Sequence, residues 1–116
     1  MNGERIQSGG GQGLVHWTKW KLLDAQAANT DGVWVDTDGF YPFSLQISGI
    51  TSASVILCGS NAEVRPANTD HGTPLHSTLT GDLFLGINMP VSWIKCRVTG
   101  YSAGTITAIL KGTGGN

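Results

Sequence analysis

The sequence is poor in charged residues. Only 13% of its 116 residues are Asp, Glu, Lys or Arg, which is about half the share of an ordinary soluble domain. The seven basic residues are scattered, and the formal net charge is −1. Nucleic-acid binding needs a basic stripe that contacts phosphates, so we expect no nucleic-acid partner. A surface with so little charge suits a subunit that packs against other proteins.

The chain also lacks long apolar runs. None approaches the ~20 residues of a membrane-spanning helix, and the first residues lack the basic-then-apolar order of a signal peptide. We therefore expect no membrane partner and folding in a cytoplasm. In that compartment Cys58 and Cys96 are expected to be reduced and to act as small buried hydrophobic residues. A bridge between two sheets, as in immunoglobulin domains, is the alternative.

No catalytic motif is present. Gly-x-Ser-x-Gly does not occur, and Cys58 has no His close to it in sequence. The segment DTDG, residues 36–39, lacks the third oxygen ligand and the distant Glu of a calcium loop. We therefore expect a protein without enzymatic activity, without a cofactor and without a metal.

One segment, RPANTDHGTPLHST at residues 65–78, does contain a carboxylate and two imidazoles, those of Asp70, His71 and His76. A zinc site needs three or four ligands of matched geometry, which makes this segment the alternative metal site. However, NTDHG resembles the turn sequences NTDG and DTDG found earlier in the chain, with one residue inserted. The pattern favours a lengthened polar loop between two strands.

Glycine is abundant, with 17 residues, and the segments between glycines are rich in Val, Ile, Thr and aromatic residues. This combination predicts an all-β, single-domain, two-sheet antiparallel β-sandwich of jelly-roll type. We place the sandwich at residues 14–112 and a short tail at residues 113–116. Residues 1–13 are predicted to form a flexible glycine-rich arm, because they contain a single Ile. Whether that arm orders against a neighbouring subunit is left open.

Eight segments are predicted to form strands. Asp31-Gly32 and Asp38-Gly39 are turn signals on either side of a short strand. Apolar and polar residues alternate in most of the other segments, as expected for half-buried strands. A helix over KLLDAQAAN is the alternative for the end of the first segment. The expected strands are residues 14–23, 33–36, 43–48, 51–61, 75–79, 83–89, 91–100 and 105–112.

Four tryptophans are many for a chain of this size: Trp17, Trp20, Trp34 and Trp93. Exposed tryptophans serve as stacking platforms for sugar rings or as anchors of protein interfaces. The simplest alternative is that they fill the core. Alternation places Trp93 on the outward face of its strand with Lys95 and Arg97, so we expect Trp93 to be partly exposed.

Two stretches, LLDAQAANTDGVWVDTDGFYPFSLQISGITSASVILCGSN and MPVSWIKCRVTGYSAGTITAILKG, resemble small β-sandwich proteins of tailed bacteriophages. The resemblance covers roughly residues 21–112, and its motifs describe a fold better than a role. The matching positions are Gly49, Ala53, Val55, Gly59, Ser60, Trp93, Ile94, Lys95, Arg97, Val98, Gly100, Tyr101, Gly104 and Ile106.

Within that group the chain is most similar to capsid decoration (cement) proteins, which clamp the joints between major capsid proteins. The resemblance implies a virion protein on the capsid surface, made in the bacterial host cytoplasm. It also implies two partners, the major capsid protein and copies of the chain itself, as a homodimer or, alternatively, a trimer. A tail or head-fibre module that binds host glycan is the second hypothesis. The candidate interface residues are Trp17, Trp20, Arg65, His71, His76, Trp93, Lys95 and Arg97.

Overall fold

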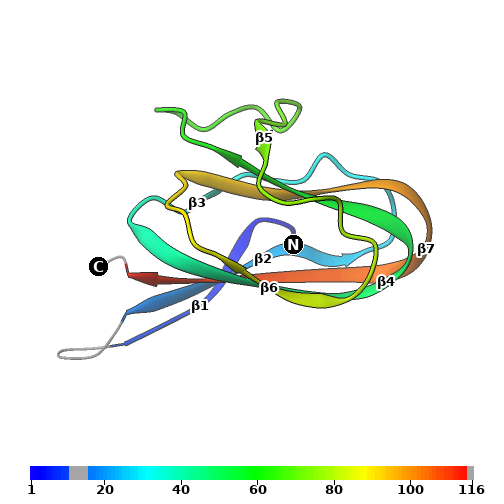
Figure 1. Ribbon diagram of the computed structural model, residues 1–116, viewed down its shortest axis with the longest axis horizontal. Helices are drawn as coiled ribbons and strands as arrows, with labels where there is room; N and C mark the ends of the chain where they lie inside the picture. The colour runs from blue at the N-terminus through cyan, green and yellow to red at the C-terminus, as the bar shows by residue number, and fades with distance from the viewer. Residues whose placement is uncertain (11–15, 115–116) are drawn as a thin grey trace.

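The computed structural model describes residues 1–10 and 16–114 (Figure 1). These residues form seven β-strands, all paired antiparallel, and no helix. They accordingly include no helix capable of crossing a membrane. The strands are β1 (Glu4–Gly9), β2 (Trp17–Gln26), β3 (Val35–Asp36), β4 (Phe40–Ser60), β5 (Thr73–Pro74), β6 (Leu83–Ile87) and β7 (Trp93–Gly114).

Two long strands, β4 and β7, form the centre of the fold. They pair with each other along nearly their whole length. Both bend sharply at the same place, where the register shifts repeatedly between Ser48 and Ser54 (Figure 1). Each strand therefore contributes one half to each of two layers.

At the bend, the backbones of Gly49 and Gly104 approach each other closely. Gly49 has φ +84° and Gly104 has φ +118°, a region that L-residues with a side chain adopt only at a cost. A Cβ on Gly49 would lie 1.8 Å from the Thr105 carbonyl oxygen, and a Cβ on Gly104 would lie 2.5 Å from the Gly49 carbonyl oxygen. The Tyr101 hydroxyl donates a 2.6 Å hydrogen bond to the Gly104 carbonyl and closes the corner.

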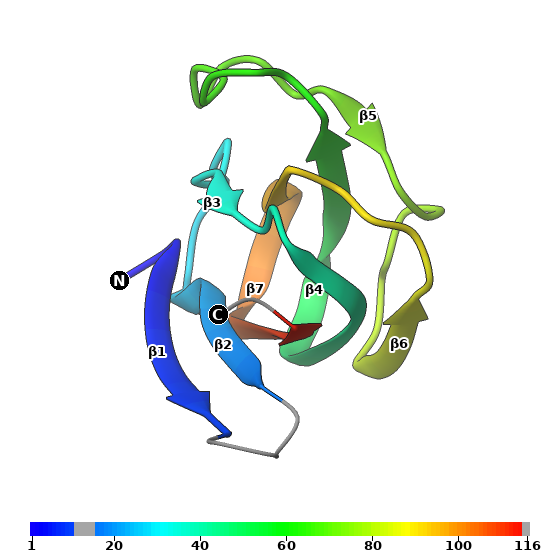
Figure 2. The same ribbon diagram turned by 90° about the vertical axis from the view of Figure 1, so that its left-hand side faces the viewer.

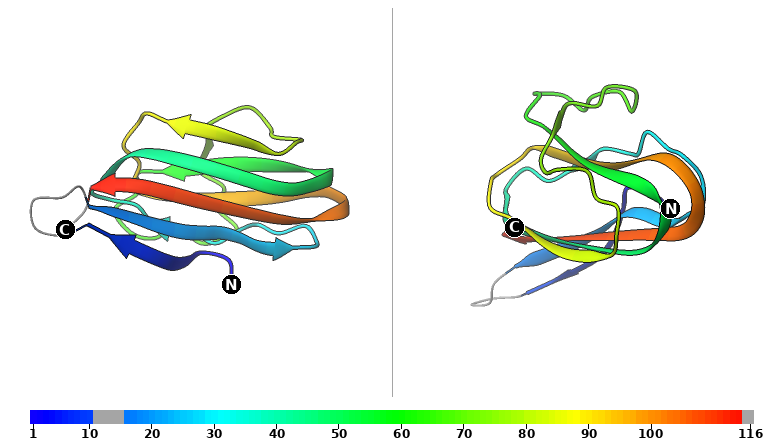
Figure 3. Two further views of the ribbon diagram at one scale, coloured as in Figure 1. Left: turned by 90° about the horizontal axis from the view of Figure 1, so that it is seen from below. Right: turned by 45° about the vertical axis from the view of Figure 1, so that its right-hand side comes forward.

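The two layers face each other across the core (Figure 2). The first layer contains β1, β2, the second half of β7, the first half of β4 and β6, side by side (Figure 3). The second contains β3, the first half of β7, the second half of β4 and β5. The predicted all-β, antiparallel, sandwich-like domain is thus confirmed. Its layers are halves of one continuous seven-stranded sheet.

The core lies between the layers and is almost entirely aliphatic. Alternation along each strand directs one set of apolar side chains inwards, as predicted for Phe43, Leu45 and Ile47. A register shift in β2 lets the successive residues Leu22 and Leu23 both be buried. Complete burial of one such side chain contributes about 1.5–3 kcal/mol. The largest core side chains that are less than 2% exposed are Trp20, Leu22, Leu23, Leu45, Ile47, Val55, Leu57, Ile94, Val98, Ile106 and Leu110.

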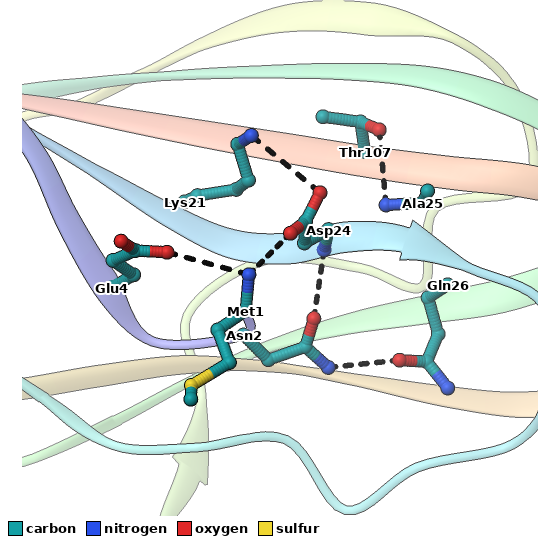
Figure 4. Close-up of polar contacts among 8 residues, drawn as sticks. All are labelled: Met1, Asn2, Glu4, Lys21, Asp24, Ala25, Gln26 and Thr107. Atoms are coloured by element: carbon teal, nitrogen blue, oxygen red, sulfur yellow. Dashed lines mark hydrogen bonds and ion pairs between the residues drawn. The ribbon is translucent and has the colours of Figure 1, made fainter.

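The prediction of a flexible arm is wrong for residues 4–9, which form β1 and pair with β2. Side chains before the strand also bind β2 (Figure 4). Asn2 Oδ1 accepts a 2.7 Å hydrogen bond from the Asp24 amide, and Asn2 Nδ2 donates to Gln26 at 2.8 Å. The segment orders through backbone pairing with an available edge, which its low apolar content does not reveal. Residues 11–13 of the predicted arm lie outside the described residues.

Other predicted boundaries also differ from the observed ones. Residues 113 and 114, assigned to a tail, continue β7, whereas residues 115–116 lie outside the described residues. The expected strand at residues 75–79 is reduced to backbone pairing of Leu75 with Leu57 and of Leu79 with Val55. The helical alternative after Lys21 is excluded, because β2 extends as a strand to Gln26.

The turn predictions are confirmed. Gly32 and Gly39 have φ +81° and +86°, and each turn contains a hydrogen bond to a side chain two residues earlier, from the Gly32 amide to Thr30 Oγ1 and from the Asp38 amide to Asp36 Oδ1. Both predictions rested on the preference of Asp-Gly for positive φ.

The two cysteines are buried and unpaired. Cys96 contributes to the core between the layers. Cys58 is paired in register with Lys95, the neighbour of Cys96 in β7, so the two side chains leave opposite faces of the second layer. This geometry excludes the cross-sheet bridge and agrees with the expected pair of small buried residues.

Candidate interaction surfaces

The loop at residues 65–72 folds over the outer face of the second layer and covers Lys95. Lys95 lies on the face opposite the core, as predicted, but its side chain is 0% exposed. Its ammonium group donates to the Asn68 carbonyl at 2.7 Å and contacts His71 Nδ1 at 3.0 Å. It also lies 4.9 Å from the centre of the Trp34 ring. The expectation of a surface lysine is therefore wrong, because the loop buries it.

His71, a residue of the loop, lies between Lys95 and Asp31 and contacts both. An ammonium group offers only protons, so Nδ1 of His71 accepts from Lys95 and the imidazole proton resides on Nε2. Nε2 faces Asp31 Oδ1 at 3.7 Å. His71 thus connects the loop to the strand β7 on one side and to the Asp31 turn on the other.

Trp34 holds the same loop from a second direction. Its indole N–H donates to the carbonyls of Ala67 and Asp70, both at 3.1 Å. Gly72 packs so closely that a Cβ there would lie 2.4 Å from the Gly59 carbonyl and 3.0 Å from the Trp34 ring. The Gly72 amide donates to Asp70 Oδ1, which is the turn predicted for NTDHG. Asp70 and His71 therefore have structural partners within the loop and its underlying strands.

Burial dominates the electrostatics beneath the loop. It lowers the pKa of Lys95, because the charged ammonium loses water and has no carboxylate in ion-pair contact among residues 1–10 and 16–114. Burial and the charges of Lys95 and Arg97 also lower the pKa of His71, more than Asp31 and Asp70 raise it. The Nε group of Arg97, two residues after Lys95 in β7, is buried without a hydrogen-bond partner in the described part of the chain.

A hollow of about 300 Å³ opens beside Trp93. Trp93 is half-buried, which confirms the expectation of partial exposure, and its indole N–H donates to the Ala62 carbonyl at 3.0 Å. The ring is therefore held in place at the wall of the hollow. The other lining residues are Asp36, Asp38, Asn61, Ala62, Glu63 and Ser92.

The remaining candidate residues are dispersed. Trp20 is 2% exposed and packs edge-on against Phe40, with ring centres 5.0 Å apart. Trp20 therefore belongs to the core, and its prediction as an interface residue is wrong. Trp17 is half-buried on the outer face of the first layer, whereas the loop at residues 65–72 covers the outer face of the second layer. Arg65 and His76 are exposed, and within residues 1–10 and 16–114 the His76 ring forms hydrogen bonds only with the adjacent Ser77.

Sequence reasoning missed Trp34 and Asn68 as partners of Lys95. The one sequence signal for Trp34 is its position in the short segment between two Asp-Gly turns, which fix the backbone on either side of it. No local signal identifies Asn68, because its contribution is a backbone carbonyl. Such a contact depends on the path of the loop and not on the side chain.

No protein-family model matches the sequence, and a search of curated proteins finds no significant match. Among solved structures, the fold is similar to the crystal structure of the SPBc2 prophage-derived protein YomS, with a TM-score of 0.68 and 15% sequence identity. The alignment covers 86% of this chain and 95% of the YomS chain. At this identity the similarity establishes a shared fold and no shared partner.

Proposed function

We propose that this chain is a bacteriophage virion structural protein without enzymatic activity, specifically a capsid decoration protein. The observation that carries the proposal is the fold, which is shared over most of both chains with a prophage-derived protein. The motif resemblance to phage β-sandwich proteins agrees with the proposal, because Gly49, Tyr101 and Gly104 of that motif build the corner of this fold.

The surface composition fits a protein that binds other proteins. Few charges are present, and several large apolar side chains are exposed, with Phe84 70% and Tyr41 50% exposed. Burial of such side chains at several small interfaces gives weak individual contacts. Repetition over many copies on a shell converts weak contacts into stable occupancy. The proposed partners are the major capsid protein and copies of the chain itself, a homodimer first and a trimer as the alternative.

The proposed mechanism is preferential binding to the expanded shell. A protein that binds only the expanded state stabilises that state by mass action, by an amount set by its concentration relative to its dissociation constant. On this proposal the protein is made in the host cytoplasm and acts on the outer surface of the capsid.

The proposal is tested by mixing the purified protein with expanded phage shells that lack it and with unexpanded shells. We expect saturable binding to expanded shells and a raised shell melting temperature, measured by calorimetry. Phe84→Ser, which removes an exposed side chain and leaves the core intact, should fold normally, and it reports whether the β6 face takes part. Absence of binding by the unchanged protein to expanded shells contradicts the decoration role.

The hollow beside Trp93 favours one second candidate, a glycan-binding fibre or tail module. A fixed indole next to carboxylate and amide groups offers a stacking surface together with acceptors for sugar hydroxyls. Glycan-array binding that is lost in Trp93→Ala but retained in Trp17→Ala would support this candidate. An array without binding contradicts it.

A further inference from the structure

The outer face of the first layer carries basic residues at paired positions. Lys19 of β2 lies directly opposite Lys111 of β7, and the next outward residue of β2, Lys21, lies opposite Ile109. The inward residues between them, Trp20 and Leu110, are in the core. Three of the seven basic residues of the chain therefore project from one side of one layer.

Lys19 and Lys111 converge on one tryptophan. The ammonium groups of Lys19 and Lys111 lie 5.5 and 4.8 Å from the centre of the Trp17 ring. The ring itself is fixed over Gly9 of β1, where a Cβ would lie 2.2 Å from it. A glycine on the edge strand thus makes room for the indole, and the indole positions both lysines.

This cluster is composed of donors without an acceptor. Neither Lys19 nor Lys111 has a carboxylate within ion-pair distance among residues 1–10 and 16–114, whereas Lys21 lies 3.5 Å from Asp24. The Trp17 indole N–H likewise has no acceptor in that part of the chain. Like charges directly opposite each other in a sheet repel, and contact with the ring brings both ammonium groups together at one place. An anionic group placed between the two ammonium groups would remove the repulsion.

The surroundings indicate which anion fits. Nucleic-acid binding relies on many phosphate contacts, and this face offers two unopposed cations, since Asp24 neutralises Lys21. Apolar side chains share the face: Ile109 lies opposite Gln46, which lies opposite the 70% exposed Phe84. Apolar anchors beside a few charges are typical of a protein interface.

We propose that the outer face of the first layer is a protein-binding surface on which Lys19, Lys111 and Trp17 hold an Asp or Glu side chain of the partner. The inference rests on the proposed function for the identity of that partner, the shell protein. It adds the face that binds and the chemistry of the contact.

The test compares charge-removing variants of equal net charge. Lys19→Gln and Lys111→Gln are measured beside Lys21→Gln, the matched control on the same face, for binding to expanded shells at several salt concentrations. We expect each of the first two to weaken binding about fivefold to tenfold and to reduce its salt dependence. Lys21→Gln should change affinity less than about twofold. Equal effects of all three variants, or no effect of any, overturn the inference while leaving shell binding intact.

A second measurement does not need shells. Hexaglutamate and a thymidine hexanucleotide are titrated into the ¹⁵N-labelled protein, and the Trp17 indole signal is followed by nuclear magnetic resonance. A saturable shift with hexaglutamate that is lost in Lys111→Gln supports the inference even if shell binding fails. No shift with hexaglutamate, or a larger one with the oligonucleotide, overturns it.

Discussion

At the residue scale, Lys95 shows how a cation is kept inside a small domain with no ion-pair partner among the described residues. Its partners are a carbonyl, an imidazole nitrogen and an aromatic face, provided by Asn68, His71 and Trp34. Each partner directs electron density at the ammonium group and carries no net charge. The arrangement depends on the neutral form of His71, since a protonated ring would place a second cation in contact with Lys95.

The glycine corner gives the sharpest prediction at this scale. Gly49→Ala is expected to destabilise the protein by at least about 2 kcal/mol, because the added Cβ would meet the Thr105 carbonyl in a backbone conformation that already disfavours alanine. Chemical denaturation followed by fluorescence measures the change in the free energy of unfolding.

Gly39→Ala is the matched control. Gly39 has nearly the same φ, +86°, but nothing lies within 4 Å of its Cβ position. The Gly39→Ala variant should lose about 1 kcal/mol of unfolding free energy, because only the disfavoured backbone conformation acts against alanine there. Equal losses for Gly39→Ala and Gly49→Ala would show that the close approach of the two backbones is not what fixes glycine at the corner.

At the element scale, the loop at residues 65–72 is held over Lys95 by His71 and Trp34, and its stability should depend on pH. The pKa of His71 is lowered from its ordinary value of 6.5. Below pH 6.5 the unfolded chain therefore binds more protons than the folded protein does, so stability falls as pH falls through the window between 6.5 and the lowered value. We expect faster amide exchange in residues 65–72 and a lower melting temperature at about pH 5 than at about pH 7.

The variant His71→Gln separates this effect from the titration of carboxylates. It should reduce the difference between the two pH values, whereas His76→Gln, an exposed histidine in the same segment, should leave it unchanged. If His71→Gln retains the full pH dependence of loop exchange, another group is responsible.

At the scale of the whole molecule, β4 and β7 hold the two layers together, because each belongs to both. Edge strands pair on one side only, as β1 does with β2. Native-state hydrogen exchange should therefore find the slowest amides where β4 and β7 pair with each other. The opening free energy of these amides should approach the free energy of global unfolding. The amides of β1, β3, β5 and β6, which each pair with one other strand, should exchange faster than those of β4 and β7. Slow exchange in β1 comparable to that of β4 would contradict this order.

The sequence by itself determined most of the strands and which side chains share a face. Alternation identified Phe43, Leu45 and Ile47 as core and Ile94, Cys96 and Val98 as one side of their strand, and the Asp-Gly pairs located two turns. These signals are local, since residue periodicity and the backbone preferences of glycine act over a few positions. The same locality explains the partial exposure foreseen for Trp93.

Tertiary structure alone decided what covers each face and which residues meet. Lys95 was expected at the surface because alternation directs it away from the core, but burial also depends on a loop that returns from 24 residues earlier in the chain. The pairing of Lys19 with Lys111 joins positions at opposite ends of the sequence, and residues 4–9 become a strand only because β2 offers an edge. Contacts between distant segments follow from how the layers pack, which a pattern of neighbours along the chain does not contain.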